Sequence, residues 1–141
     1  MTTLQVVRRF LLAILTIGMA GTAIELLLLK HDEGAIQLIP LVLLGAGLVT
    51  ISWHVLRPSR ASLLVVQLAM AGFLAAGLAG MFFHFRANLQ YQREFDAGLH
   101  GRALFWQALQ AKVPPALAPG VLLQFGLIGL AYTYGQRGDL K

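Results

Sequence analysis

The chain of 141 residues contains no cysteine. This absence excludes disulfide bonds, thiolate metal ligands, iron–sulfur clusters and a cysteine nucleophile. Charged residues are scarce as well: lysine, arginine, aspartate and glutamate together make up 12% of the chain, whereas hydrophobic residues make up 57%. A soluble domain of this size leaves too much of its surface in water to hide so much apolar area. The composition therefore predicts that lipid surrounds most of the chain.

Sequence signatures of catalysis are also absent. There is no glycine-rich phosphate loop, no Gly-x-Ser-x-Gly elbow and no His-Glu-x-x-His pair. Most polar segments are short, which leaves little mass for a soluble catalytic domain. We therefore expect a protein that is not an enzyme. Its expected partners are the lipid bilayer and other membrane protein subunits or further copies of itself, and we expect no nucleic acid partner.

Four apolar runs divide the sequence. An α-helix rises about 1.5 Å per residue, so about 20 apolar residues cross a hydrocarbon layer about 30 Å thick. The runs predict spans over residues 10–29, 35–56, 61–85 and 116–134. The turns between the first three are so short that consecutive spans must lie antiparallel. The predicted fold class is an all-α membrane protein, a four-transmembrane-helix antiparallel bundle that forms a single integral membrane domain over residues 1–141.

One long polar connection, residues 86–115, separates the third and fourth spans. So long a stretch without regular structure would be unusual in a compact protein. Within it, residues 101–112 place apolar side chains on one helical face and polar side chains on the other, with Trp106 suited to the membrane boundary. This pattern predicts a short amphipathic interfacial helix. Residues 86–97 are expected to continue the third span as a helix, until the glycines that follow break it.

Small residues recur at every fourth position of the third run, at Gly72, Ala76 and Gly80. In lipid, hydrophobicity does not drive helices together, and small side chains instead allow two backbones to approach closely. We interpret this run as the central packing helix, against which another span lies.

Basic residues predict the orientation of the spans. The side that carries both termini and the turn at residues 57–60 consists of short segments that are almost purely basic, with Asp139 as the one acid. On the other side, basic and acidic residues are mixed. Because lysine and arginine concentrate on the cytoplasmic side of membrane proteins, we predict that both termini are cytoplasmic and that the long connection lies outside.

Glu25 is the only acid inside an apolar run. An ionised carboxylate in hydrocarbon is costly, so it is normally paired, protonated or turned toward water. Glu25 lies about 6 Å from the outer end of its predicted span, at 1.5 Å per residue. One interpretation is an interfacial carboxylate, hydrogen-bonded to a neighbouring helix or to Lys30. The other is a functional proton or cation site.

Two glutamines, Gln67 and Gln124, lie well inside the third and fourth predicted spans. In antiparallel helices of this length the two amides could come within reach of each other. An interhelical amide hydrogen bond would contribute about 1 kcal/mol. The alternative interpretation is that the glutamines line a polar pathway.

Three histidines, His31, His84 and His100, all belong to the predicted outer side, where several carboxylates also lie. Imidazole and carboxylate ligands suit Zn, Cu(II) or Fe. No compact ligand spacing such as His-x-x-x-His is present, however. We expect interfacial histidines with ordinary hydrogen bonds, and a metal at the outer face is the alternative.

The arrangement of spans resembles that of short bacterial inner-membrane proteins with four spans, which implies a multi-pass protein of the cytoplasmic membrane. The resemblance is one of architecture and transfers no residue. The leading hypothesis is a non-enzymatic integral membrane protein that acts through helix packing, as a homo-oligomer or as an accessory subunit of a larger complex. The alternatives are a transporter or channel for a small solute, proton or cation that uses Glu25, Gln67 and Gln124, and an outer-face metal or redox site with His31, His84 and His100.

Overall fold

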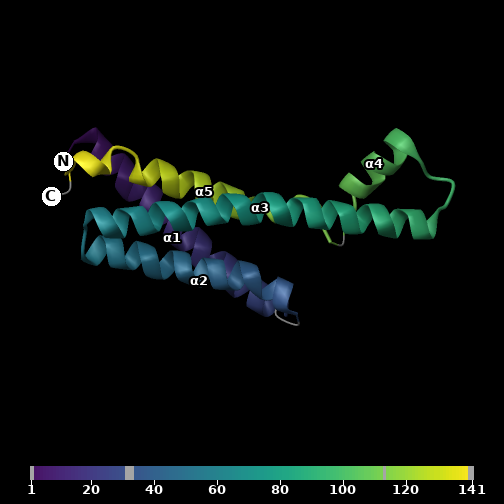
Figure 1. The fold of residues 1–141 in the computed structure, drawn as a ribbon, viewed down its shortest axis with the longest axis horizontal. Coiled ribbons are helices and arrows are strands. Elements are labelled where there is room, and N and C mark those ends of the chain that lie inside the picture. Colours follow the sequence, from purple (N-terminus) through teal and green to yellow (C-terminus); the bar gives the residue numbers. More distant parts are fainter. Residues whose placement is uncertain (1, 31–33, 113, 140–141) are drawn as a thin grey trace. The chain divides into compact units, whose positions relative to one another are not determined.

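The computed structural model describes residues 2–30, 34–112 and 114–139. In chain order, its elements are α1 (Thr3–Leu28), α2 (Ala35–Leu56), α3 (Arg60–Phe95), α4 (Gly101–Leu109), α5 (Gly120–Thr133) and the short 3-10 helix η1 (Gln136–Asp139) (Figure 1). Within these described ranges there is no β-strand, and a single isolated bridge pairs Lys112 with Pro115. The predicted all-α class is confirmed.

Three of the helices, α1, α2 and α3, are long and apolar enough to cross a membrane, judged by length and composition. They indicate a multi-pass helical membrane protein. The fourth apolar run forms a shorter helix, because α5 has only 14 residues. At 1.5 Å per residue it rises about 21 Å, less than the hydrocarbon thickness of about 30 Å.

Helix α1 begins seven residues before the predicted span, at Thr3 rather than at residue 10. A capping box explains the early start. The Thr2 hydroxyl accepts a hydrogen bond from the Gln5 amide at 3.3 Å, and the Gln5 side chain accepts one from the Thr2 amide at 2.9 Å. These two bonds satisfy amide groups that the first turn of a helix otherwise leaves without partners.

Helix α3 contains the predicted third span and continues to Phe95, as expected for residues 86–97. No glycine or proline interrupts this continuation. The last turn closes with a hydrogen bond from the Asp96 amide to the Gln92 carbonyl at 2.9 Å. The Asp96 carboxylate then accepts the Gly98 amide at 2.9 Å, in an Asx turn that leads the chain away from the helix.

The helix predicted at residues 101–112 is present as α4, which ends at Leu109. The fourth apolar run, predicted to be helical from residue 116, becomes α-helical only at Gly120. Prolines account for the delay. A proline disfavours the helical conformation of the residue before it, so Pro115 and Pro119 oppose a helix at Pro114 and Ala118, and residues 116–119 form turns.

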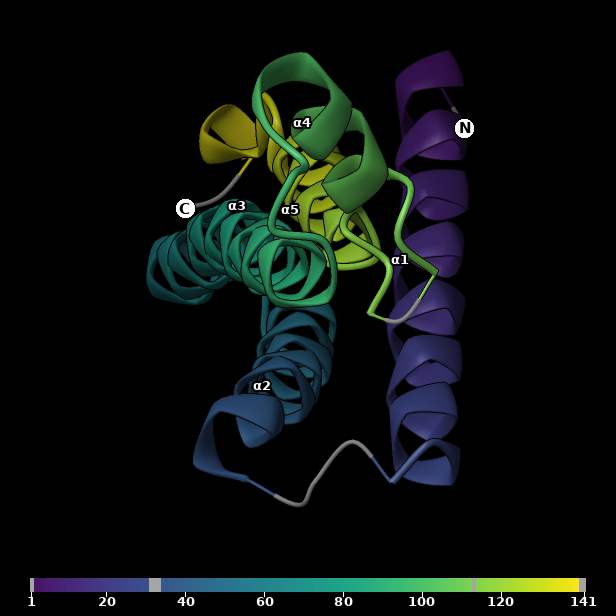
Figure 2. The same cartoon turned by 90° about the vertical axis from the view of Figure 1, so that its right-hand side faces the viewer.

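The described chain forms two compact units. Unit 1 comprises Met1–Leu74 and Gln124–Lys141, and unit 2 comprises Ala75–Leu123. In unit 1, α1 and α2 form an antiparallel pair (Figure 1), and Figure 2 views this pair nearly along α2. The first half of α3 and most of α5 complete the bundle. Its core consists of fully or almost fully buried apolar side chains from all four helices: Leu15, Met19, Leu44, Met70, Phe73 and Phe125.

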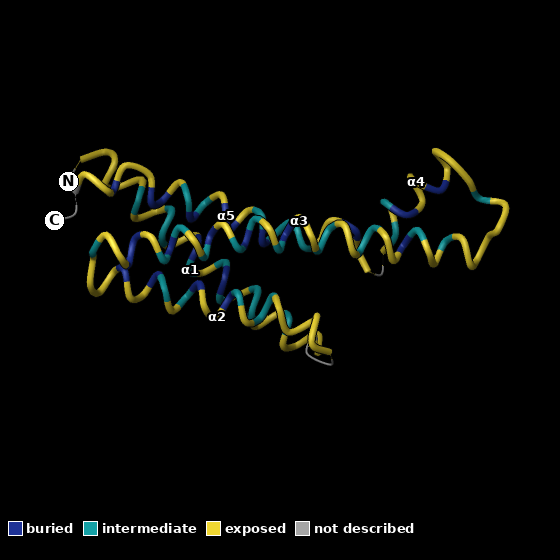
Figure 3. Tube along the Cα trace, in the orientation of Figure 1, coloured by how far each residue is buried: buried dark blue, intermediate teal, exposed yellow. Residues whose placement is uncertain are grey.

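The pair α1–α2 is exposed at the end where the chain passes from α1 to α2. Almost every described residue from 24 to 39 is exposed, including Leu28 and Ile36 at 79% and 76% (Figure 3). The buried residues of the two helices lie further along, from Leu15 to Met19 and from Leu44 to His54. The core of unit 1 therefore lies toward the Arg9 and His54 end of this pair.

Unit 2 is built on the second half of α3. Helix α4 packs against α3 through Leu104 and Ala108, which are 4% and 0% exposed. The Phe85 and Phe105 rings meet edge to face, with centroids 5.2 Å apart. Ala116, from the turns before α5, is also buried in this unit.

Candidate functional site

A buried polar cluster in unit 1 centres on His54, near the end of α2. The His54 side chain is 3% exposed, and both of its ring nitrogens have partners. Nδ1 lies 2.8 Å from the Ser62 hydroxyl, at the start of α3, and Nε2 lies 2.9 Å from Gln136 Oε1, in η1. The Tyr132 ring meets the His54 ring edge to face, at a centroid distance of 6.4 Å. His54 thereby joins α2, α3, α5 and η1.

Ser62 has a second role, because it also caps α3. The Ser59 hydroxyl accepts the Ser62 amide at 3.1 Å, and the Ser62 hydroxyl accepts the Ser59 amide at 3.0 Å. This reciprocal pair resembles a capping box, with serine in place of the usual acidic residue. The Ser62 hydroxyl also lies 3.1 Å from the carbonyls of Arg57 and Ser59, either of which can accept its hydrogen.

Gln136 reaches His54 because the chain leaves the α-helical path at Gly135. Gly135 has φ of 73°, a left-handed conformation that favours glycine, immediately after the end of α5. The Gln136 amide nitrogen donates to the Tyr132 carbonyl at 2.6 Å. Since a carbonyl can only accept, this contact orients the amide so that Oε1 faces His54.

These partners define the protonation patterns that the cluster can hold. Because Gln136 Oε1 is an acceptor, His54 Nε2 must carry a hydrogen. In neutral His54, Nδ1 accepts from the Ser62 hydroxyl. In charged His54, Nδ1 donates to Ser62, whose hydroxyl turns to the Arg57 or Ser59 carbonyl. Both patterns satisfy the two ring nitrogens of His54, and they differ in whether the Ser62 hydrogen goes to Nδ1 or to a backbone carbonyl.

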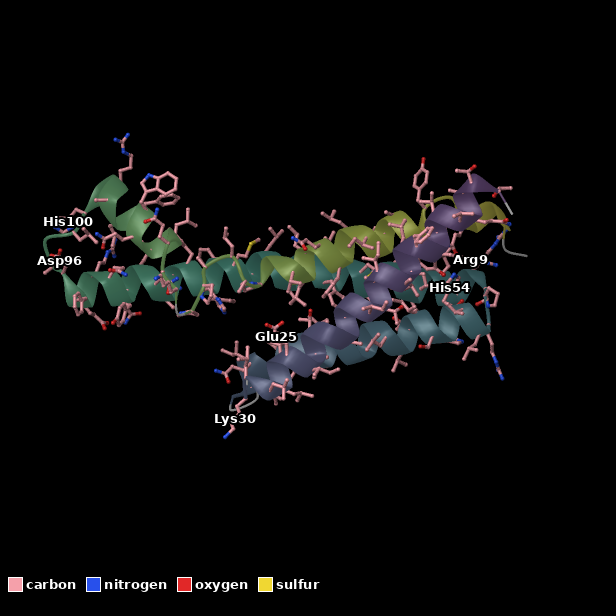
Figure 4. The ribbon with its side chains drawn as sticks, turned by 180° about the vertical axis from the view of Figure 1, so that it is seen from behind. Arg9, Glu25, Lys30, His54, Asp96 and His100 are labelled. Carbon is pink, nitrogen blue, oxygen red and sulfur yellow. The ribbon has the colours of Figure 1, made fainter. Side chains whose placement is uncertain are left out.

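A recess of about 350 Å³ opens beside this cluster. Its polar lining comes from the first turns of α1 and from the cluster itself, and its apolar lining from both α1 and α2. Figure 4 shows Arg9 and His54 at the same end of unit 1, opposite Glu25 and Lys30 on α1. The polar lining residues are Gln5, Arg8, Arg9, His54, Tyr132 and Gln136.

Arg8 connects this recess to the end of α5. Its Nη2 donates to the Tyr134 carbonyl at 2.7 Å. Carbonyls in the last turn of a helix have no partner within the helix, and a cation near that end is favourable to the helix dipole. Arg8 therefore holds the first turns of α1 to the end of α5.

A second buried polar group, Asn88 of α3, organises unit 2. Its side chain is 2% exposed, and its amide nitrogen donates to the Ala108 carbonyl at 3.2 Å and to the Pro114 carbonyl at 3.0 Å. These carbonyls lie at the end of α4 and in the proline-rich turn. One side chain thus fixes the path of the chain as it leaves α4.

The histidines of the predicted outer side do not meet in a described cluster. His84 Nδ1 donates to the Pro115 carbonyl at 3.0 Å. His100 is exposed and precedes the first turn of α4, near Asp96 in Figure 4. His31 lies outside the described residues. Across the described ranges, no three histidine, aspartate or glutamate side chains lie close enough together to hold a metal ion.

Glu25 is exposed on the surface of α1. It lies near the Lys30 end of the helix (Figure 4). Within the part of the chain that the structure describes, its carboxylate makes no hydrogen bond with a neighbouring helix or with Lys30. Glu25 therefore faces the surroundings of the chain, whether lipid, headgroups or another protein.

The structure does not bring Gln67 and Gln124 together. Gln67 is half-buried, and its amide nitrogen lies 3.5 Å from the Thr133 hydroxyl, which itself donates to the Leu130 carbonyl at 3.0 Å. Gln124 is exposed on α5. The interhelical contact of Gln67 is therefore with a threonine nine residues further along α5 than Gln124.

The predicted packing residues of α3 divide between the two units. In unit 1, a Cβ atom added to Gly72 would lie 3.8 Å from Leu43, an ordinary contact. In unit 2, a Cβ atom on Gly80 would lie 2.7 Å from Pro119, which is too close. Ala76, in unit 2, is half-buried.

A tighter approach occurs at Gly77, outside the four-residue repeat. A Cβ atom there would lie 2.6 Å from the backbone nitrogen of Leu123, so the two backbones are nearly in contact. Small residues therefore allow α3 to lie against the segment that enters α5, at Gly80 of the predicted ridge and at Gly77 beside it.

Sequence reasoning missed the two buried polar groups that matter most, His54 and Asn88. Signals for them exist. His54, Ser59 and Ser62 lie on either side of Pro58, in the turn where two helix ends meet. Asn88 is a polar residue with low helix propensity inside a helical extension. Neither signal names the distant partner.

No protein-family model, no curated protein and no solved structure matches this chain.

Proposed function

We propose that this chain is a four-span, non-enzymatic protein of the bacterial inner membrane that works as a subunit. It docks through a rigid, aromatic outer extension onto a partner membrane protein or a second copy of itself. The outer extension is defined as residues 86–112, the end of α3 together with α4. Both termini are cytoplasmic in this proposal.

Exposed apolar side chains support a membrane location. Ile17 of α1, Val42 of α2 and Leu68 of α3 are 73%, 67% and 63% exposed. Single exposed apolar residues are common on soluble proteins, but extensive apolar surfaces mark contact with lipid or protein. The three long helices carry such residues along most of their length.

The turns before α5 support a fourth crossing. Amide-to-carbonyl hydrogen bonds link Ala118 to Pro115 at 3.2 Å and Gly120 to Leu117 at 2.9 Å, a spacing of three residues. These turns lengthen the apolar segment ahead of α5. Together with the rise of about 21 Å for α5, they bring the segment closer to the hydrocarbon thickness of about 30 Å.

A pair of exposed aromatic rings carries the proposal of docking. Phe95 lies ten residues, or about 15 Å of helix, beyond Phe85 at the end of the apolar run. Tyr91 and Phe95 stack with centroids 6.3 Å apart, and they are 62% and 81% exposed. Aromatic side chains at such sites are typical anchors of protein interfaces.

The rigidity of the outer extension also supports docking. Asn88 ties the end of α4 and the following turn to α3, and the Phe85 and Phe105 rings pack against each other. A surface that is already ordered binds without losing further conformational entropy.

Site-specific photo-crosslinking tests this function. A benzophenone side chain is placed at Tyr91 or Phe95 and, as a control, at Arg93, which lies about 200° around α3 from Tyr91. We expect an adduct of defined mass from the first two positions and none from the third. Native mass measurement after gentle solubilisation then shows whether the partner is a second copy. Equal adducts from all three positions, or a monomer that forms none, would contradict the proposal.

Topology has its own test, because the chain contains no cysteine. Ala97→Cys introduces a single thiol in the outer extension. A maleimide that cannot cross membranes should label it from outside in intact cells. Labelling only after the cytosolic face is opened would refute the proposed orientation.

A further inference from the structure

We propose that the recess beside His54 binds the phosphate headgroup of an anionic glycerophospholipid. The recess lies in unit 1, between the first turns of α1, the end of α2, and the end of α5 with η1. This inference rests on the proposed membrane location, which places the recess at the cytoplasmic headgroup layer.

Arg8 and Arg9 supply the chemistry of anion recognition. Both line the recess. A guanidinium carries five N–H donors in a planar fork that matches phosphate oxygens. Both arginines have contacts within the protein, among them the bond from Arg8 to the Tyr134 carbonyl. Such contacts hold both guanidinium groups at the recess, where a bound phosphate would share their donors.

The position of these arginines fits a lipid headgroup. They stand immediately before the apolar run that begins at Phe10, so in a membrane they lie at the boundary between headgroups and hydrocarbon. Basic pockets between helices on the cytoplasmic side are suited to anionic headgroups.

The remaining lining also matches an amphiphile. Leu12, Val55 and Pro58 form the apolar part of the recess, and Val55 is half exposed, so the recess continues onto a lipid-facing surface. Gln5 and Gln136 add polar groups beside the arginines. The volume of about 350 Å³ is within the range of small-molecule sites. A headgroup can thus occupy the polar part while an acyl chain leaves along Val55.

Quenching of tryptophan by brominated lipids tests the site in the full chain. The chain has two tryptophans, and Trp106→Phe leaves only Trp53, next to His54 on α2. The protein is reconstituted into vesicles that contain brominated phosphatidylglycerol or brominated phosphatidylcholine. We expect Trp53 to show about a 30-fold preference for the anionic lipid, the value that two basic groups at a membrane surface would give.

Matched variants separate the recess from general surface charge. Arg8→Gln with Arg9→Gln should abolish the preference. Arg57→Gln with Arg60→Gln removes the same charge from the same end of the molecule, outside the lining of the recess, and should retain most of it. Arg9→Gln alone should weaken the preference several-fold. Because this variant keeps the bond from Arg8 to Tyr134, it serves as a control for loss of the fold in the double variant.

Each contrary outcome has a distinct meaning. No preference in the parent, or equal loss in both double variants, overturns the headgroup site. Competition by inorganic phosphate or glycerophosphate at millimolar concentration assigns the recess to a soluble anion and overturns the lipid assignment. If the protein is instead released from vesicles by alkaline carbonate, the proposed membrane function itself fails.

Discussion

Unit 1 and unit 2 satisfy their buried polar groups in different ways. In unit 1, His54 bonds to the side chains of Ser62 and Gln136. In unit 2, Asn88 bonds to two backbone carbonyls, those of Ala108 and Pro114. A network of side chains can change its pattern of donors, whereas a bond to the backbone fixes the path of the chain. The contacts of His54 in unit 1 are therefore the more adaptable, and those of Asn88 in unit 2 the more constrained.

The close helix contacts at Gly129 and Gly77 also differ in how easily the neighbouring atoms can move. At Gly129 in unit 1, an added Cβ atom would meet the thioether of Met70, which can move. At Gly77 in unit 2, it would meet the backbone of Leu123, which cannot. Gly126 is an exception within unit 1, because a Cβ atom there would lie 2.8 Å from the Met70 carbonyl. Among the close contacts of these two glycines in unit 1, the one against the Met70 thioether is the more tolerant, because a methionine side chain is flexible.

The largest expected effect comes from removing the two hydrogen bonds of the Asn88 side chain in unit 2, here called the Asn88 clamp. Asn88→Leu leaves the Ala108 and Pro114 carbonyls without their donor and should destabilise unit 2 by about 3 kcal/mol. Hydrogen exchange of the amides in α4, measured in detergent, should rise strongly. Gln90→Leu, on the exposed side of the same helix, is the control and should change exchange in α4 little. Unchanged protection in Asn88→Leu would show that the clamp does not hold α4.

A smaller effect is expected from the glycine contacts. Gly77→Ala should cost about 2 kcal/mol, since the added methyl group meets the Leu123 backbone. Gly129→Ala should cost less, because Met70 can adopt another rotamer. Gly21→Ala, with nothing within 4 Å, should be neutral or stabilising, since alanine favours helices. Thermal unfolding in detergent ranks the three variants, and a Gly129 variant as unstable as the Gly77 variant would contradict the contrast between units.

The smallest effect is expected from the contact between His54 and Gln136 in unit 1. His54→Leu, Gln136→Leu and the double variant form a thermodynamic cycle. The coupling energy between the two positions should be about 1 kcal/mol, the usual value of one hydrogen bond. Chemical unfolding of each variant gives the terms of the cycle. A coupling indistinguishable from zero would mean that the contact between His54 and Gln136 adds no stability.

The sequence alone predicted most of the helices. Apolar runs and their polar flanks indicated α2 over residues 35–56, as observed, and the helical continuation of the third run. Local features explain this success, because hydrophobic periodicity and breakers act over a few residues. The start of α5 at Gly120 was harder to predict, since it depends on how three prolines shape one turn.

The site was much less predictable than the helices. Glu25 and Gln124 attracted attention as polar residues in apolar runs, yet both are exposed. His54 and Gln136 are 82 positions apart and meet through tertiary packing. Composition and spacing mark an unusual residue, but they do not show which distant side chain will face it.

The double role of Ser62 has a consequence for the order of assembly of unit 1. Its contacts with Ser59 and His54 span three and eight positions, whereas the contact between His54 and Gln136 closes a loop of 82. Short loops close at lower entropic cost than long ones. The turn from α2 to α3 can thus position the His54 ring early, before the Nε2 hydrogen has Gln136 as its partner. The contact between His54 and Gln136, which follows Gly135, would then form last and complete the bundle.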